Sequence, residues 1–326
     1  MTRCFLGIDI GSTKSHALIA DEDGRALGFG ASGAGNPEGV GYKGLTEVAC
    51  AAAYQALDTG GITTAQIAGA GFGISGYDWP SQREAMLRAL APLGLSAPLE
   101  IVNDATVGLL AGASEGWGIA VVAGTGCNCR GWDRARREGR AVGFGDWTGE
   151  GAGAGDVVAR AWHAIGYEWT RRGPATRLTQ AFIELTGARD IEDVLEGLTT
   201  ERYRLGAAAA PVVFRVAAEG DAAAREVIRW AGRELGGLAT GVIRQLGFES
   251  LSFEVVLAGS LYDGGPLLIE AMRETIHAVA PGARLVRLAA PPVVGGVLLG
   301  MEQAGLQASA LREPLIHSTN ELLQRA

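Results

Sequence analysis

A carboxylate and a cluster of small polar residues follow the first apolar run of the chain. The stretch FLGIDIGSTK gathers five of them within six positions: Asp9, Gly11, Ser12, Thr13 and Lys14. This is not a Walker A loop, because that motif places its lysine directly after a glycine and leads into a helix, whereas a second apolar run follows here. The backbone N–H groups and hydroxyls of a hairpin turn can still bind phosphate oxygens, with Asp9 facing a hydrated Mg²⁺ that bridges them. An ordinary tight β-turn is the competing interpretation.

A similar turn occurs in the middle of the chain. The stretch WGIAVVAGTGCNCRGW again gives an apolar run, a turn at Gly124, Thr125 and Gly126, and a second run before a charged turn. This weak echo of the N-terminal pattern suggests two related domains. We place their boundary near residues 115–118, so that residues 1–117 form the first domain and residues 118–326 the second. Each domain would then contribute one phosphate-binding turn.

A third candidate stands where an expected strand, residues 99–102, meets an expected helix. Asn103 and Asp104 lie at that junction, which is where open sheets present functional side chains. Capping of the helix explains both residues equally well. A carboxylate at a helix N-terminus stays ionised, and Asp104 could therefore accept the proton of a sugar hydroxyl during phosphoryl transfer.

Residues 143–155, GFGDWTGEGAGAG, are too rich in glycine for an ordinary strand end. Phe144, Trp147 and Glu150 resemble a sugar-binding lip, in which an aromatic face meets the ring and a carboxylate meets the hydroxyls. A flexible loop is the alternative. Asn36 and the Ser75-Gly76 pair end expected strands and could add hydrogen bonds, although each alone is typical of a turn.

The composition excludes several classes of protein. The net charge of −8 gives no electrostatic footprint for nucleic acid or for an anionic membrane. The four cysteines fit neither a disulfide framework nor a zinc site. The N-terminus has neither a signal peptide nor a membrane span, so that a cytoplasmic location is the expectation. Of two G-x-G-x-x-G matches, the one at residues 28–33 lies in an expected meander, which is the wrong context for a dinucleotide-binding fold. The one at residues 71–76 follows a strand and precedes a helix, so that a dinucleotide site is an alternative there, but Asp104 lies rather far downstream to be the acid that binds the ribose.

The periodicity of the sequence predicts a mixed sheet covered by helices in each domain. In the first domain we expect strands at residues 4–10, 15–20, 26–32, 67–74 and 99–102, with helices between them. In the second domain three strands are followed by a mostly helical region over residues 157–247, and then by a strand at 254–257, a helix at 266–277, a strand near 284–288 and a final small-residue helix at 291–305.

These stretches together resemble the N-acetylglucosamine kinase family, which belongs with the BadF/BadG/BcrA/BcrD-type ATPases in the actin-like sugar kinase superfamily. The resemblance covers nearly the whole chain, and it rests on the order and spacing of the motifs. They are DIGSTKSHALIAD at 9–21, Asn36, Ser75-Gly76, NDA at 103–105, GTGCNCR at 124–130, GFG at 143–145, AAEGDAAAREVI at 217–228 and LAGS at 257–260.

The resemblance implies two actin-like (ribonuclease H-like) α/β domains around a cleft for ATP and sugar, with Asp104 as the catalytic base. ATP would be bound by the two turns, with Gly220 and the turn at Gly259 and Ser260 beside the adenosine. Mg²⁺ would be held by Asp9 through water. The implied sugar-binding residues are Asn36, Ser75, Gly76, Asn103, Asp104, Asn128, Gly143, Phe144, Gly145 and Glu150.

The chain departs from the family at the lip. Where the family has a pattern like G-W-G-x-x-x-G-D-E-G-S, this chain has G-F-G-D-W-T-G-E-G-A, so that one acid is missing and either Glu150 or Asp146 replaces it.

The expected function is ATP-dependent phosphorylation of the 6-hydroxyl of N-acetylglucosamine or glucosamine. The partners are therefore ATP and a small amino sugar, with a homodimer left open as the assembly. Two alternatives are an ATPase that activates a partner enzyme through an iron–sulfur cluster and a sugar sensor without catalytic activity.

Overall fold

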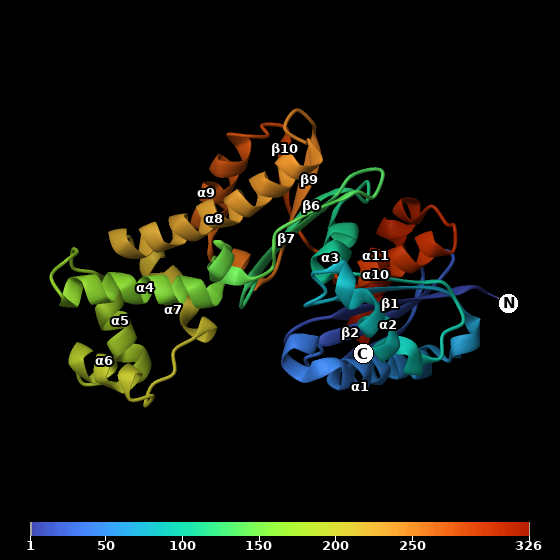
Figure 1. Ribbon diagram of the computed structural model, residues 1–326, viewed down its shortest axis with the longest axis horizontal. Coiled ribbons are helices and arrows are strands. Elements are labelled where there is room, and N and C mark those ends of the chain that lie inside the picture. The colour runs from blue at the N-terminus through green and yellow to red at the C-terminus, as the bar shows by residue number, and fades with distance from the viewer. Residues whose placement is uncertain (1, 326) are drawn as a thin grey trace.

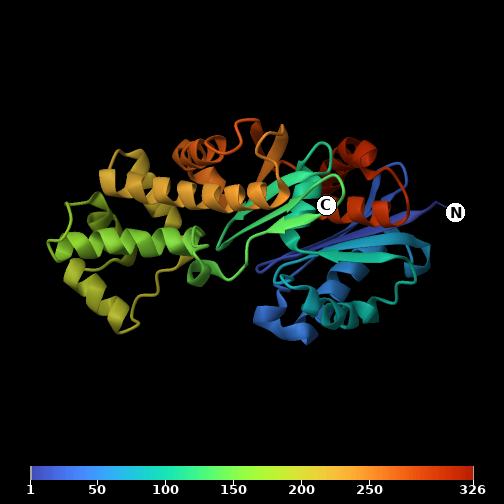
Figure 2. The same cartoon turned by 45° about the horizontal axis from the view of Figure 1, so that its top comes forward.

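Two five-stranded sheets form the centre of the molecule, which is a computed structural model that describes residues 2–325. Figures 1 and 2 show the sheets following one another along the long axis. The first sheet has the order β3-β2-β1-β4-β5. Its strands are β1 (Cys4–Ile10), β2 (Ser15–Asp21), β3 (Ala26–Ser32), β4 (Ile67–Ile74) and β5 (Leu99–Val102). Strands β1 to β3 form an antiparallel meander, while β4 and β5 continue parallel to β1.

The second sheet repeats this topology. Its order is β8-β7-β6-β9-β10, with the same sequence of antiparallel and parallel neighbours. Its strands are β6 (Gly118–Ala123), β7 (Cys127–Trp132), β8 (Glu138–Arg140), β9 (Phe253–Ala258) and β10 (Ala283–Arg287). The expectation of two mixed five-stranded sheets in an α/β fold is confirmed, and the internal echo in the sequence corresponds to a repeated sheet.

Helices cover both faces of the first sheet. Helix α1 (Pro37–Gly60) packs on β2 and β3 on one face and against α2 (Arg83–Leu90). On the other face, α10 (Val293–Gln303) packs on β1 and β4, and α11 (Ala308–Arg325) packs against β3. The division at residue 117, which stays a proposal, therefore assigns to the second domain two helices that complete the core of the first sheet.

Helix α3 (Asp104–Gly112) lies between the two sheets. It packs on β4 from the first sheet and on β6, β7 and β9 from the second. The helix is almost entirely buried. It begins at the Asn103-Asp104 pair, so that a candidate site lies where the two halves of the molecule meet.

The remaining helices belong to the second half. Helix α8 (Ala222–Leu246) covers β6, β7 and β8 and packs along α9 (Pro266–His277). Figure 1 shows α4, α5 and α6 at the end of the molecule remote from the first sheet. Their bounds, with that of α7, are α4 (Ala154–Trp169), α5 (Arg177–Thr186), α6 (Ile191–Thr199) and α7 (Ala210–Ala218). None of the helices in the described part of the chain is long and apolar enough to cross a lipid bilayer.

Candidate functional site

The first glycine and hydroxyl turn connects β1 to β2. The N–H of Gly11 donates to the carbonyl of Lys14 at 3.1 Å and closes the turn. Ser12, Thr13 and Lys14 are exposed on it. The exposed hydroxyls and lysine of this turn are therefore accessible to an anionic ligand.

Three polar residues that lie far apart in the sequence meet beside this turn. The Ser12 and Ser75 hydroxyl oxygens are 3.0 Å apart, and Asn36 Nδ2 donates to Ser12 Oγ at 3.3 Å. Asn36 Oδ1 accepts the N–H of Glu38 at 2.9 Å and so caps α1. Gly76 has φ +79°, and a Cβ there would lie 2.4 Å from Asn36 Oδ1. Gly76 thus allows the close approach of Asn36 and contributes no side chain of its own.

Asn103 and Asp104 begin α3 at the same end of the first sheet. Asn103 is the N-cap, since its Oδ1 accepts the N–H of Ala105 at 3.0 Å. Asp104 Oδ1 accepts the same N–H at 2.9 Å. Ser75 also acts on Asp104 through a hydrogen bond that favours its charged form. The structure therefore unites Asp104 with the cluster beside the first turn.

Two carboxylates of this region have unusual proton affinities. Burial raises the pKa of Asp104 to about 6, and its own hydrogen bond from the backbone opposes part of that rise. Burial and the nearby charge of Asp104 raise the pKa of Asp9 to about 7, and only Lys14 opposes them. A hydrated cation fits here, because it would relieve the repulsion between the two carboxylates and because Mg²⁺ prefers oxygen ligands.

The second turn, between β6 and β7, occupies the same place in its sheet as the first does but is one residue tighter. The N–H of Gly124 donates to the carbonyl of Gly126 at 2.8 Å, and Gly124 accepts the N–H of Ala154 at 2.8 Å. Helix α4 thus begins directly against this turn. Gly153 is required there, since a Cβ would lie 2.4 Å from the Cα of Gly126. Thr125 is exposed on the turn.

The turn after β9 lies against the end of β6. Gly259 has φ +104°, and a Cβ there would lie 2.2 Å from the carbonyl oxygen of Ala123. Gly259 and Ser260 therefore lie next to the second turn, so that a single ligand could contact both turns. Gly220 is exposed, with φ +95°, directly after α7. The contacts of the structure do not join Gly220 to the other candidate residues among residues 2–325.

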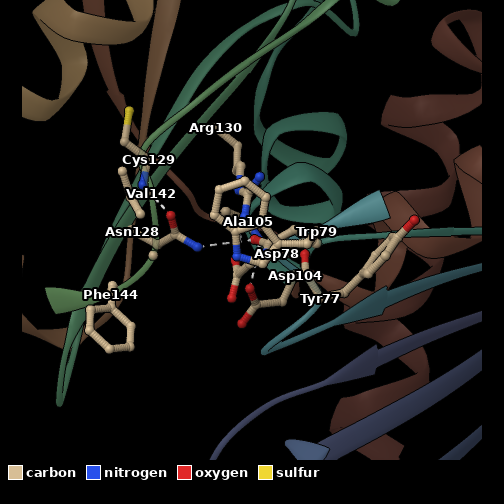
Figure 3. Close-up of polar contacts among 12 residues, drawn as sticks. Tyr77, Asp78, Trp79, Asp104, Ala105, Asn128, Cys129, Arg130, Val142 and Phe144 are labelled. Atoms are coloured by element: carbon tan, nitrogen blue, oxygen red, sulfur yellow. Dashed lines mark hydrogen bonds and ion pairs between the residues drawn. The ribbon is translucent and has the colours of Figure 1, made fainter. Parts of the chain in front are cut away.

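Residues from the second half reach across to Asn103 and its neighbour Asp78. Asn128 on β7 donates from Nδ2 to Asn103 Oδ1 at 3.3 Å. Arg130, two residues further on the same strand, donates from Nη2 to Asp78 Oδ1. Figure 3 shows Asn128 and Arg130 directed from β7 toward the neighbouring carboxylates of Asp78 and Asp104. The two halves are thus joined by polar contacts at the start of α3.

The lip contains two exposed aromatic side chains and an acid whose carboxylate oxygens accept hydrogen bonds from backbone N–H groups of the same loop. Phe144 is 67% and Trp147 90% exposed. The buried carboxylate of Glu150 accepts the N–H groups of Val142 at 2.6 Å, Gly143 at 2.8 Å and Phe144 at 3.2 Å. Glu150 therefore fixes the path of residues 142–144, while the carboxylate of Asp146 lies on the exposed 3₁₀ turn Gly145–Thr148.

Cys127 and Cys129 belong to β7, behind the second turn. Cys129 is buried, and Cys127 Sγ donates to the carbonyl of Glu150 at 2.9 Å. Burial raises the pKa of Cys127 to about 12, and burial raises that of Cys129 as well. Both side chains are therefore thiols at neutral pH.

Sequence reasoning assigned no role to Asp78 or Arg130. Arg130 is 1% exposed and is the largest fully buried side chain in the described part of the chain. One signal was present, because an arginine in the middle of an apolar strand must be paired if it is buried. Its partner could not be found from the sequence, since 52 positions separate it from Asp78.

Comparison with known proteins identifies the family of this chain. The profile of the BadF/BadG/BcrA/BcrD ATPase family matches residues 6–300. The N-acetyl-D-glucosamine kinase of Dictyostelium discoideum is 27% identical, over 91% of this chain and 97% of that protein. The N-acetylmuramic acid/N-acetylglucosamine kinase of Clostridium acetobutylicum is 22% identical, over 91% of this chain and 98% of that protein.

Solved structures share the fold. A protein from Chromobacterium violaceum, described as a candidate N-acetylglucosamine kinase, superposes with a TM-score of 0.65 at 22% identity, over 91% of this chain and 98% of its own. A ROK family glucokinase from Streptomyces griseus, solved with glucose and AMPPNP, gives a TM-score of 0.56 at 18% identity, over 93% of this chain and all of its own.

Proposed function

Because the chain belongs to the BadF/BadG/BcrA/BcrD ATPase family, we propose that it is an ATP-dependent amino-sugar kinase that phosphorylates the 6-hydroxyl of N-acetylglucosamine or glucosamine. The observation that carries the proposal is the convergence at Asp104. From the first half, Ser75 hydrogen-bonds to Asp104 and is itself joined to Ser12 and Asn36. From the second half, Asn128 donates to Asn103, the residue directly before Asp104. Small polar groups of this kind orient a sugar within a cleft.

In the proposed reaction Asp104 accepts the proton of the attacking hydroxyl. Its pKa of about 6 leaves it ionised at neutral pH yet basic enough to take that proton. Catalysis of phosphoryl transfer otherwise depends on positioning and on neutralising charge. The backbone N–H groups and hydroxyls of the two turns would orient the phosphates for in-line attack.

Asp9 would hold Mg²⁺ through water, and the metal ion would supply charge neutralisation at the β- and γ-phosphates. Lys14, exposed on the same turn, would add a second positive charge near the phosphate oxygens. Gly259 and Ser260 would flank the nucleoside beside the second turn.

Of the two acids at the lip, we assign Asp146 to the sugar hydroxyls. The oxygens of Glu150 already accept three backbone N–H groups, and this acid therefore holds the lip in shape. Asp146 lies between the exposed Phe144 and Trp147, whose apolar faces suit the ring of a sugar. Asp146→Asn should raise the KM for sugar and leave that for ATP unchanged.

The test is ADP release in the presence of Mg·ATP and a panel of sugars: glucosamine, N-acetylglucosamine, N-acetylmuramic acid, N-acetylmannosamine and glucose. Glucosamine or N-acetylglucosamine should stimulate release most strongly, and the product should carry its phosphate on the primary hydroxyl by NMR. Stimulation by none of the amino sugars would refute the proposal. Sugar binding with no ATP turnover would favour the sensor instead.

The position of the cysteines argues against the iron–sulfur alternative. A cluster needs exposed cysteine thiolates if it is to bridge two subunits. Cys129 is buried and Cys127 donates to a backbone carbonyl. The pKa values of both are raised by burial, which disfavours the thiolate form.

A further inference from the structure

An ion pair between the two halves lies beside the candidate base. Arg130 comes from β7 in the second half, and Asp78 follows β4 in the first. The guanidinium also places Nη1 3.5 Å from Glu138 on β8. The side chains of Arg130 and Asp78 are 2% and 10% exposed. An unpaired charge at such a position is costly, so that the halves must meet in the one arrangement that pairs them.

The ion pair continues into the start of α3. Asp78 Oδ1 also accepts from Asn103 Nδ2 at 3.2 Å. Asn103 Nδ2 donates in addition to the carbonyl of Tyr77 at 3.2 Å, while its Oδ1 caps Ala105 and accepts from Asn128. We call the four side chains of Arg130, Asp78, Asn103 and Asn128 the clasp. Two of its members, Arg130 and Asn128, lie on β7, and a third, Asn103, directly precedes Asp104.

We propose that Arg130 and Asp78 are positioning residues for the phosphorylation reaction. Their ion pair joins the two halves and holds Asn103 in place, and this sets the position of Asp104 relative to Asn128. This inference rests on the proposed function, because it assigns to Asp104 a hydroxyl to deprotonate. Neither residue of the pair needs to touch the sugar or the nucleotide for this role.

The clasp also supports the lip. Gly143 has φ +85°, and a Cβ there would lie 3.0 Å from the carboxylate of Asp78. The backbone that enters the lip is therefore packed directly on the ion pair. One interaction thus sets the position of the base and of the loop that faces the sugar.

An arginine is needed at this position. Its Nη2 and Nη1 reach acids on two different elements, Asp78 and Glu138, at the same time. The planar guanidinium presents its donors in a fixed geometry, whereas the ammonium group of lysine is a single point of charge. Arg130→Lys should therefore keep the positive charge but lose the fixed orientation of the hydrogen-bond donors toward Asp78 and Glu138.

The decisive experiment compares Arg130→Met with Arg83→Met in steady-state kinetics. Arg83 pairs with Glu100 inside the first half, on elements near the clasp, and is the matched control. Arg130→Met should lower kcat by about 10²-fold, the scale of a small misplacement of reacting groups, and leave the KM for Mg·ATP unchanged. Arg83→Met should retain the activity of the wild type. An equal loss in both variants, or a change in KM alone, would overturn the inference.

Removal of Arg130 alone leaves Asp78 buried without its cation and endangers folding. The double variant Arg130→Met with Asp78→Asn removes both charges. It should regain the melting temperature of the wild type while its kcat stays low. Recovery of kcat together with stability would show that the pair serves the fold alone. Arg130→Lys should likewise be stable and should not recover the full kcat.

Hydrogen exchange separates this inference from the proposed function. With no substrate present, the backbone amides at the start of α3, residues 104–107, should exchange faster in the double variant than in the wild type and in Arg83→Met. Unchanged exchange there would refute the role of the clasp. If the wild type phosphorylates no sugar but the exchange differs as expected, the function is wrong and the clasp stands as a device that orders α3.

Discussion

Ionisation of Asp9 and Asp104 is less favourable than ionisation of a carboxylate at the surface. Burial is the main cause of the raised pKa of each carboxylate, and the negative charge of Asp104 raises the pKa of Asp9 further. A carboxylate that loses its hydration binds protons and cations more tightly. The same pair therefore suits a base and a metal-binding group, provided that the pH lies above their pKa values.

The activity should fall on the acid side of about pH 6. Asp104 must be ionised to accept a proton, and its pKa, raised to about 6, means that the charged form is lost as the pH falls through that value. The pH profile of kcat/KM for the sugar tests this expectation. A profile that stays flat well below pH 6 would show that a different group acts as the base.

Asp104→Ala should lower kcat by at least about 10²-fold, the typical contribution of a general base. Nucleotide affinity should change little, because the two turns that we propose to bind the phosphates are not altered. Turnover and calorimetric titration with ATP measure the two effects separately. Near-normal turnover in this variant would exclude Asp104 as the base.

At the scale of residues, local patterns could be predicted and distant pairs could not. The cap at Asn103 and the polar residues Asn36 and Ser75 stand at ends of strands, which the sequence marks by composition. Asn36 and Ser75 meet Ser12, which confirms that such strand ends share one edge of a sheet. The pairing of Arg130 with Asp78 depends on the docking of the two halves, so that the sequence around Arg130 does not indicate its partner.

Among the elements, α10 explains why several positions on it and on the first sheet are glycine. A Cβ at Gly7 on β1 would lie 2.3 Å from the backbone N of Val297, and one at Gly71 on β4 would lie 2.4 Å from the carbonyl oxygen of Gly296. The helix thus packs backbone to backbone on the sheet. These glycines serve the packing of the helix on the sheet.

Gly295→Ala should destabilise the fold markedly. A Cβ at Gly295 would lie 1.9 Å from the carbonyl oxygen of Val107 in α3, and overpacking of this kind costs roughly 1–3 kcal/mol or more. The control is Gly237→Ala in α8, where the Cβ meets open space. That change should stabilise the helix by up to about 1 kcal/mol. Urea unfolding measures both, and equal stability of the two variants would contradict the packing argument.

Most elements could be predicted because each has its own periodicity. The helix expected at residues 266–277 is α9, and the five strands of the first sheet lie within a residue of their expected bounds. Helix α11 was not predicted, since Pro314 interrupts a weakly amphipathic stretch. The placement of α10 on the first sheet was also missed, because sequence order assigned it to the second domain.

At the scale of the molecule, the two halves are joined by more than the chain between them. Helix α3 packs on both sheets, the clasp links β7 to the first half, and Arg136 in the turn after β7 pairs with Glu302 in α10. The start of α3, where Asp104 lies, is held by both halves.

A chain that ends at residue 292 should fail to fold. It lacks α10 and α11 and so exposes the face of the first sheet that carries Phe5 and Leu18, both fully buried in the intact protein. A chain that ends at residue 307 keeps α10 and should fold with a lower melting temperature. Circular dichroism and dye binding to exposed apolar surface distinguish the two. A soluble, cooperatively folded 1–292 fragment would contradict this expectation.

The position of α10 also imposes an order of events during protein synthesis. The strands of the first sheet are complete once β5 ends at Val102, but their second cover begins only at Val293. About 190 residues must be translated in between, which takes roughly 10–40 s at ordinary elongation rates. Throughout that interval the nascent chain presents an uncovered apolar sheet face. The first half to be made is thus among the last to be finished, and chaperones on the ribosome have a defined surface to protect.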